Sequence, residues 1–366
     1  MVQRLVLTSW PIVRYVAGFA LVGVAVWVLV SHGDELSGLP DVLKRLSWGW
    51  VLLAVLAELL SYICFARMQL ELLRSGGLDV PMFPLVKMTF AAQALGNSLP
   101  GGTAVSAVYG FRWFRRFGAS NGLAGWSAAG TVVASGVSLT LVAAIGLALA
   151  ASQGASLDLV PAIVGTLLIA IGLGALFVYE RPLFVAVSAL LRASRRISGK
   201  PRGDTSAQIE RVIGSITSVR LTWRQIGRIL LWGTSNWLFD CACFAMMFPA
   251  IHSPIPWEGL LLAYGAGQLA AALPITPGGL GAVEGSITIA LVEFGGAQVA
   301  TVDAVLLYRL VSFWLVLLVG WAICGELAFE VRAGRWRRQA LLTPVEAGPG
   351  SEAVSQLPGS PQGREP

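Results

Sequence analysis

The chain has 366 residues, of which 55% are hydrophobic and only 13% are charged. A soluble domain averages about 25% charged residues, so this composition excludes a soluble globular enzyme and predicts an all-α polytopic membrane protein. The formal net charge of +6 indicates membrane topology and not a nucleic-acid partner, because the basic residues lie between apolar stretches.

Cysteine and histidine usage indicates neither a disulfide framework nor a metal site. The four cysteines all lie in apolar stretches, none forms a CxxC pair, and neither histidine is near them in the sequence. They are interpreted as small buried apolar residues. We expect no metal and no cofactor. The cysteines are Cys64, Cys241, Cys243 and Cys324.

The apolar stretches predict about six full transmembrane helices and two broken helical pairs. Each full stretch is at least about as long as the roughly 20 residues that a helix needs to cross the hydrocarbon layer. The expected full spans are 11–30, 48–66, 121–150, 159–179, 229–249 and 304–328. The expected broken pairs are 82–99 with 103–111, and 257–273 with 278–294.

The second broken pair is interrupted by the stretch Leu273-Pro-Ile-Thr-Pro-Gly-Gly-Leu-Gly-Ala-Val-Glu284-Gly285. Proline removes a backbone donor, and glycine gives up backbone entropy without restraining the chain, so a helix does not continue through this stretch. Irregular backbone at membrane depth is tolerated only inside protein or along a watery cavity. The interruption is therefore either a kinked hairpin or a site, and we favour a site.

The same interruption occurs twice, which favours the site. A shift of 177 residues places Pro100-Gly101-Gly102 on Pro277-Gly278-Gly279, and it places Phe117-Gly118 on Phe294-Gly295. Internal repeats with interrupted helices at matching positions are typical of transporter binding sites. We therefore expect two repeat halves, at about 48–150 and 229–330.

The distribution of arginine and lysine predicts the orientation of these segments. With the amino terminus in the cytoplasm, the basic connectors all fall inside and the connectors poor in positive charge fall outside. The longest connector, 180–228, holds ten basic residues against three acids. This layout gives a membrane domain at 1–340, a disordered cytoplasmic tail at 341–366 and both termini inside. Three full spans separate the broken pairs, so the repeat is predicted to be inverted.

Two charged residues are the first candidates for chemistry. Glu284 follows the second interruption at the expected start of a half-helix, and an ionisable group at that depth marks a functional candidate that needs a partner. Arg309, in the final span, is the expected partner. An ion pair that only fixes two helices is the alternative reading, and it is compatible with a gate.

Other polar residues in apolar segments are further candidates. Asp240 and Asn236 are four residues apart and share one helix face, where they could face a cavity or hydrogen-bond to another helix. Glu58, and Gln93 with Asn97, have the same ambiguity. The candidate substrate-binding or gating residues are Glu284, Arg309, Pro277, Gly278, Gly279, Gly281, Pro100, Gly101, Gly102, Asn97, Asp240, Asn236 and Arg112.

The half-helices that follow each Pro-Gly-Gly would direct free backbone N–H groups and a positive dipole end toward the membrane interior. Such helix starts suit an anionic group such as phosphate. The residues alone therefore predict an inverted-repeat transporter with an anion-compatible site at the midplane.

The chain resembles the transmembrane domain of the lysylphosphatidylglycerol synthase family, over about residues 10–335. The resemblance lies in Pro277-Gly-Gly-Leu-Gly-Ala-Val-Glu284 with Arg309, and in Leu99-Pro-Gly-Gly102 with Tyr109-Gly-Phe-Arg112. In the two-part synthases this domain flips an aminoacylated lipid that a separate soluble domain makes. Because this chain ends in a short tail, the resemblance implies translocation without aminoacylation.

One departure bears on the substrate. Many relatives carry an acid and an arginine just after the first Pro-Gly motif, whereas this chain reads Thr103-Ala-Val-Ser-Ala-Val108 there. The substrate is therefore expected to differ from that of relatives that keep the pair.

The predicted function is translocation of a lipid, or a lipid-linked anionic head group, across a bacterial plasma membrane by alternating access. The alternative is a non-transporting scaffold subunit for a lipid or cell-envelope enzyme. Partners would be the lipid itself, a second copy or a membrane enzyme, and not a nucleic acid. An intramembrane enzyme is not expected, since the sequence contains no HExxH or Gly-x-Ser-x-Gly motif.

Overall fold

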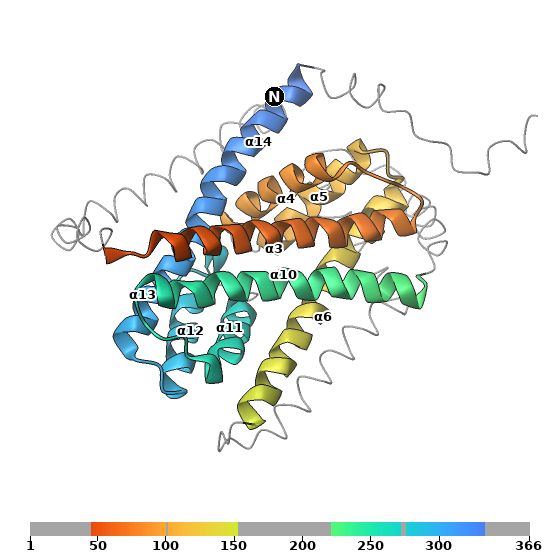
Figure 1. Cartoon of the computed structure of the whole chain (residues 1–366). Helices are drawn as coiled ribbons and strands as arrows, with labels where there is room; N and C mark the ends of the chain where they lie inside the picture. Colours follow the sequence, from red (N-terminus) through yellow and green to blue (C-terminus); the bar gives the residue numbers. More distant parts are fainter. Residues whose placement is uncertain (1–44, 100–101, 153–220, 272–275, 334–366) are drawn as a thin grey trace, which may run out of the picture. The chain divides into compact units, whose positions relative to one another are not determined.

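The computed structural model describes residues 45–99, 102–152, 221–271 and 276–333, and every regular element within these ranges is a helix (Figure 1). The all-α fold class is confirmed for this part of the chain. The expected spans 11–30 and 159–179, most of the connector 180–228, the tail 341–366 and Pro100-Gly101 lie outside the described residues. The six-span count and the inverted repeat stay predictions.

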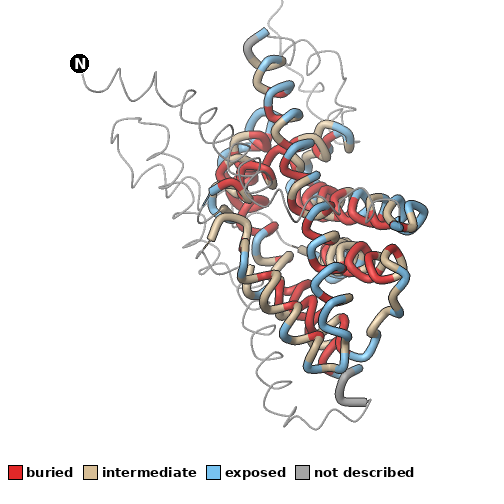
Figure 2. Tube along the Cα trace, turned by 90° about the vertical axis from the view of Figure 1, so that its left-hand side faces the viewer, coloured by how far each residue is buried: buried red, intermediate tan, exposed pale blue. Residues whose placement is uncertain are grey.

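Three helical stretches among the described residues are long and apolar enough to cross a membrane: Trp48–Ser75, Asn121–Leu149 and Gln298–Val331. The first two correspond to α3 (Trp48–Ser75) and α6 (Asn121–Ser152). Large apolar side chains such as Leu52, Leu56 and Leu60 are exposed on α3. Figure 2 shows such exposed positions between buried ones along the helices. An exposed leucine row is costly in water and suited to lipid.

Helix α10 (Trp223–Ala250) begins earlier than the span expected at 229–249. Thr222 and Gln225 form a capping box, in which the Thr222 hydroxyl accepts from the Gln225 N–H and the Gln225 side chain accepts from the Thr222 N–H. This cap fixes the helix start inside the basic connector. Helix α10 packs along α3 and against α6 (Figure 1). The Trp237 indole N–H donates to the Ser135 carbonyl of α6 at 2.9 Å.

The first broken pair consists of α4 (Met82–Asn97) and α5 (Gly102–Arg116), which pack against each other. At 1.5 Å per residue, helices of 16 and 15 residues are about 24 and 22 Å long, shorter than the roughly 30 Å hydrocarbon layer. The adjoining ends of the two helices meet at Gly96 and Gly102, where a Cβ on Gly102 would overlap the Gly96 carbonyl. Glycine therefore permits the close backbone approach typical of membrane helices.

The second broken pair consists of α11 (Trp257–Ala271) and α12 (Ala282–Glu293), with the 3₁₀ turn η2 (Pro277–Gly279) between them. Helices α11 and α12 pack together, and a Cβ on Gly267 would overlap the Ile287 side chain. Both interruptions that the prolines and glycines predict are thus bordered by helix ends where the sequence places them.

The last span is not one regular helix. It comprises α13 (Gln298–Arg309), the π-helical segment η3 (Leu310–Leu315) and α14 (Val316–Arg332). The helix begins before the expected residue 304, and the sequence gives no sign of the π segment. Single π turns inside α-helices are frequent at functional sites, and this one directly follows Arg309.

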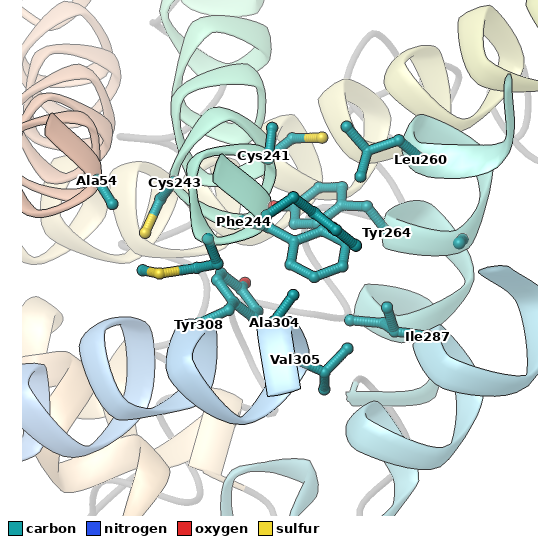
Figure 3. Close-up of a cluster of buried hydrophobic side chains, with 14 of the residues drawn as sticks. Ala54, Cys241, Cys243, Phe244, Leu260, Tyr264, Ile287, Ala304, Val305 and Tyr308 are labelled. Atoms are coloured by element: carbon teal, nitrogen blue, oxygen red, sulfur yellow. The ribbon is translucent and has the colours of Figure 1, made fainter. Parts of the chain in front are cut away.

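Buried apolar side chains from α3, α10, α11, α12 and α13 form a core cluster among the described residues. Phe244 lies at its aromatic centre, beside Tyr308 (Figure 3). The ring centroid of Phe244 is 5.3 Å from that of Tyr308 and 5.6 Å from that of Phe248. Contacts group the described residues up to Cys324 into one compact unit. In the second unit, residues 325–333 form the end of α14.

Candidate functional site

The second interruption is a turn that only glycine adopts readily. Gly278, Gly279 and Gly281 have φ values of 59°, 68° and 83°, in the left-handed region that disfavours a Cβ. The Thr276 hydroxyl donates to the Leu280 carbonyl at 2.9 Å across the turn. The chain then enters α12 at Ala282. Pro277 opens the turn, where its fixed φ suits a first helical position.

Glu284 lies in the first turn of α12 and binds in two directions. Its Oε2 accepts from the Gly281 backbone N–H at 2.7 Å, which satisfies one of the free donors at the helix start. Its Oε1 accepts from the Arg309 Nε at 2.6 Å. A carboxylate near a helix N-terminus is also stabilised by the helix dipole.

Arg309 joins the end of α13 to the interruption. Its Nη2 donates to the Gly278 carbonyl at 2.9 Å, and its guanidinium carbon lies 4.5 Å from the centroid of the Phe313 ring. Only 11% of its side chain and 21% of that of Glu284 are exposed. Arg309, the partner predicted for Glu284 from the sequence, thus forms an ion pair with Glu284. A charged pair held this far from water marks an electrostatic centre of the domain.

The first interruption lies beside this centre. Leu280 packs against a buried cluster of Ala94, Phe313 and Leu317, and α4 contacts η2. On the other side, the Trp321 indole N–H donates to the Ser98 hydroxyl at 3.0 Å, one residue after the end of α4. The two interruptions, about 177 residues apart in sequence, therefore adjoin through the last helical span.

The remaining candidate residues at the first interruption lie at the helix ends that border it, within α5, or outside the described residues. Asn97 is the last residue of α4 and is half-buried, and Gly102 is the first residue of α5. Arg112 is half-buried in α5, with the exposed Arg115 and Arg116 following it. Pro100 and Gly101 lie outside the described residues.

Asp240, on α10, is the acceptor of a second polar network next to the ion pair. Its carboxylate accepts from the Tyr264 hydroxyl at 2.7 Å, the Tyr308 hydroxyl at 2.9 Å and the Gln268 amide at 3.4 Å. The same Gln268 amide donates to the Tyr308 oxygen at 2.9 Å. Tyr308 directly precedes Arg309, so one turn of α13 contributes to both networks.

Asn236 does not join that network. Its amide donates to the Ser61 hydroxyl at 2.6 Å and to the Ser61 carbonyl at 3.2 Å, so it links α10 to α3. Of the two readings open for Asp240 and Asn236, the helix-to-helix hydrogen bond describes both, because Asn236 binds α3 while Asp240 binds α11 and α13.

The residues predicted from the sequence do not include three members of this network: Tyr264, Gln268 and Tyr308. Tyrosine and glutamine in apolar stretches are common and carry little signal individually. Two patterns pointed to them. Tyr264 and Gln268 are four residues apart and share one face of α11, and Tyr308 adjoins a residue already singled out.

Comparison with known proteins now assigns the chain. Residues 15–320 match the family described as the lysylphosphatidylglycerol synthase TM region. The chain belongs to this family. The resemblance that the Pro-Gly-Gly and Glu284 motif indicates is thereby confirmed, and with the apolar helices it places the protein in a membrane.

The family also has a similar member in an archaeon. A UPF0104 membrane protein of Methanothermobacter thermautotrophicus is 28% identical over 112 residues. The match covers 30% of this chain and 34% of that relative, so the chain matches about a third of the relative's length. Both comparisons support a membrane protein of the synthase transmembrane type.

Proposed function

We propose that this protein translocates a lipid, or a lipid-linked anionic head group, across the membrane that contains it. The observation that carries the proposal is the Glu284–Arg309 pair, buried at an interrupted helix and held by the backbone of the interruption. Burying an ion pair is expensive, and a purely apolar contact would fix two helices as well. A pair retained in such a place is therefore suited to exchange with a charged ligand.

The exchange would work by substitution of one anion for another. An anionic head group that approaches Arg309 competes with the Glu284 carboxylate for the same guanidinium donors. Glu284 keeps its bond to the Gly281 N–H and the favourable end of the α12 dipole when Arg309 leaves it. Neither the arginine nor the glutamate is then stranded without a partner, which lowers the cost of the step.

The interruptions give this exchange a mechanical consequence. Arg309 also holds the Gly278 carbonyl, so withdrawing its guanidinium from Glu284 acts on the left-handed turn of the interruption. Because α4 contacts η2, a change at one interruption acts on the other. This linkage supports alternating access, in which the site opens to one membrane face at a time.

The test is translocation of labelled anionic, zwitterionic and polyprenyl-phosphate lipids in reconstituted vesicles. Glu284→Gln keeps the shape and the bond to Gly281 but removes the charge, and we expect it to slow transport of the moved class by at least about tenfold. Glu293→Gln, an exposed acid at the end of the same helix, is the matched control. It should leave transport unchanged.

Two outcomes would contradict the proposal. Wild-type rates in a folded Glu284→Gln variant would remove Glu284 from the mechanism. If a monodisperse wild-type protein moves none of the three lipid classes, the proposal that this protein transports lipid is wrong. The scaffold reading would then be examined by co-purification with a membrane enzyme.

A further inference from the structure

Glu58 is a buried acid that the proposed exchange does not use. It lies on α3, is 6% exposed, and its Oε2 has no hydrogen-bond partner among the described residues. Its carboxyl is within hydrogen-bonding reach of two groups of α10, the Cys243 thiol and the Asp240 carboxyl. A buried polar atom without a donor is costly, so the environment of this oxygen requires an explanation.

A shared proton supplies the missing donor. Two ionised carboxylates in contact repel each other and offer only acceptors, whereas one proton between them makes a strong hydrogen bond. Asp240 already accepts from Tyr264, Tyr308 and Gln268. Since the Asp240 carboxyl is already the acceptor of these three bonds, we assign the donor role within the pair to Glu58.

Within the part of the chain that the structure describes, the groups found to act on Glu58 are Asp240 and Cys243, and neither is a cation. On α3 the adjacent ionisable group is Tyr62, whose ring stacks on Phe90 of α4, and α13 contributes Tyr308. Helix α6 and segment η3, which also pack on α3, contain no ionisable side chain. Lys87, the one ionisable residue of α4, places its ammonium 5.0 Å from the Phe83 ring centroid. The nearest cation of the network is Arg309, which acts on Asp240 and is paired with Glu284.

The charges of the buried network can be counted. With one proton on the Glu58–Asp240 pair the pair carries one negative charge, and the Glu284–Arg309 pair carries none. Arrival of a head group with one negative charge would raise the buried charge to two. A second proton on the carboxyl pair restores it to one, so that the network carries the same charge with and without the lipid.

We propose that Glu58 and Asp240 form a proton-carrying carboxyl pair that couples one proton to the movement of each singly charged anionic head group. The inference rests on the proposed function of the adjoining Glu284–Arg309 site and names its driving force. The proton is taken from hydronium on the face where the head group enters. It is released to water on the face where the head group leaves, and no other bond is made or broken. Tyr308 links the two pairs, since its hydroxyl binds Asp240 and its neighbour is Arg309.

The proton itself is tested by infrared spectroscopy of the purified protein in an ester-free detergent. We expect a carbonyl stretching band of a protonated carboxyl at neutral pH, where ordinary Asp and Glu side chains are ionised. The band should shift on deuterium exchange and be lost in Glu58→Gln. It should persist in Glu71→Gln, since Glu71 is a buried acid of the same helix that pairs with Arg228 at 3.3 Å. Absence of the band in wild-type protein overturns the inference.

Coupling is tested in vesicles that carry either a pH gradient or a potassium-diffusion potential. One proton per monoanion is electroneutral, so the potential alone should not move the labelled lipid, and each pH unit should concentrate it about tenfold in the leaflet on the alkaline side. Glu58→Gln should abolish this concentration, and Glu71→Gln should not. If the rate of lipid movement and the final lipid distribution are both independent of the pH gradient, the proton coupling is wrong while the proposed transport stands. If wild-type protein moves no lipid, both are wrong.

Discussion

At the scale of single residues, the interruption before α12 depends on glycine for two separate reasons. Gly278 and Gly281 both have positive φ, which costs a residue with a Cβ roughly 1–2 kcal/mol. They differ in their surroundings. A Cβ on Gly278 would overlap the Phe313 ring, whereas a Cβ on Gly281 would meet nothing within 4 Å.

Alanine substitution separates these two costs. Gly281→Ala should lower the free energy of unfolding by about 1–2 kcal/mol through backbone strain alone. Gly278→Ala should lower it further and weaken transport, because the Phe313 ring under Arg309 must move. Chemical unfolding in detergent measures the first effect and vesicle transport the second. An equal loss of unfolding free energy in the two variants would show that the Phe313 ring moves aside without cost.

The ion pair itself is suited to a double-mutant cycle. Arg309→Gln alone should cost about 3 kcal/mol of unfolding free energy, at the low end for a buried pair because 21% of the Glu284 side chain is exposed. Adding Glu284→Gln should recover more than half of that loss, since no charge is then left unpaired. Strictly additive losses would mean that the two side chains are not coupled in the folded protein.

Much of this residue-scale picture was accessible from the sequence. Charge at an apolar depth singles out Glu284 and Arg309, and proline with glycine singles out the interruption. The tyrosines around Asp240 were only weakly marked in the sequence, by spacing and adjacency, because their role depends on which helices meet. Glu58 and Asp240 are far apart in the chain, and nothing local to either residue indicates that their carboxyls adjoin.

At the scale of elements, the two broken pairs use small residues in the same way but at different positions. In α4 and α5 the close approach is between Gly96 and Gly102, and in the second pair a Cβ on Gly279 would lie 3.0 Å from the Cα of Ala271. Each pair is therefore closed at its interruption by backbone contact. This closure fixes the distance between the half-helices, which side-chain packing alone would leave adjustable.

Widening the first pair should therefore be costly. Gly102→Ala should lower the unfolding free energy and reduce transport, since its Cβ would overlap backbone that cannot rotate away. The control is Gly110→Ala in the same helix, where the nearest contact is an ordinary 3.9 Å to Phe114. That variant should be neutral or more stable by up to about 1 kcal/mol, from helix propensity. Equal stability of the two variants would contradict the backbone closure.

Element boundaries were mostly predictable because hydrophobic length and helix-breaking residues determine them. The differences occur where contacts or caps act. The Thr222–Gln225 capping box extends α10 into a basic connector, and the π segment η3 lies in a run that is apolar except for Ser312. A π turn reflects the packing of neighbouring helices, so no single-residue preference marks it.

At the scale of the whole molecule, the orientation in the membrane follows from charge and stays a prediction. The turn after α5 is preceded by Arg115 and Arg116, and the turn before α13 lies between apolar helices. The positive-inside rule places the first turn in the cytoplasm and the second outside.

Cysteine labelling tests this orientation directly. Ser120 and Gln298 are exposed, and the four native cysteines are buried, so single added cysteines can be read without removing the natural ones. A membrane-impermeant maleimide should label Gln298→Cys in intact cells and label Ser120→Cys only after permeabilisation. The reverse pattern would invert the orientation, and equal labelling of both sites in intact cells would contradict the predicted number of crossings.

The π segment has a consequence for how the last span serves two places at once. Arg309, before η3, binds the turn at Gly278, and Trp321, after it, binds Ser98 beside the other interruption. Each residue of an α-helix turns the chain by about 100°, and a π turn absorbs one extra residue. The π segment therefore determines the angle about the helix axis between the directions in which Arg309 and Trp321 point. Deleting one residue from 310–315 would keep Arg309 and Trp321 but rotate one relative to the other by about 100°. The last span could then contact either interruption, but not both.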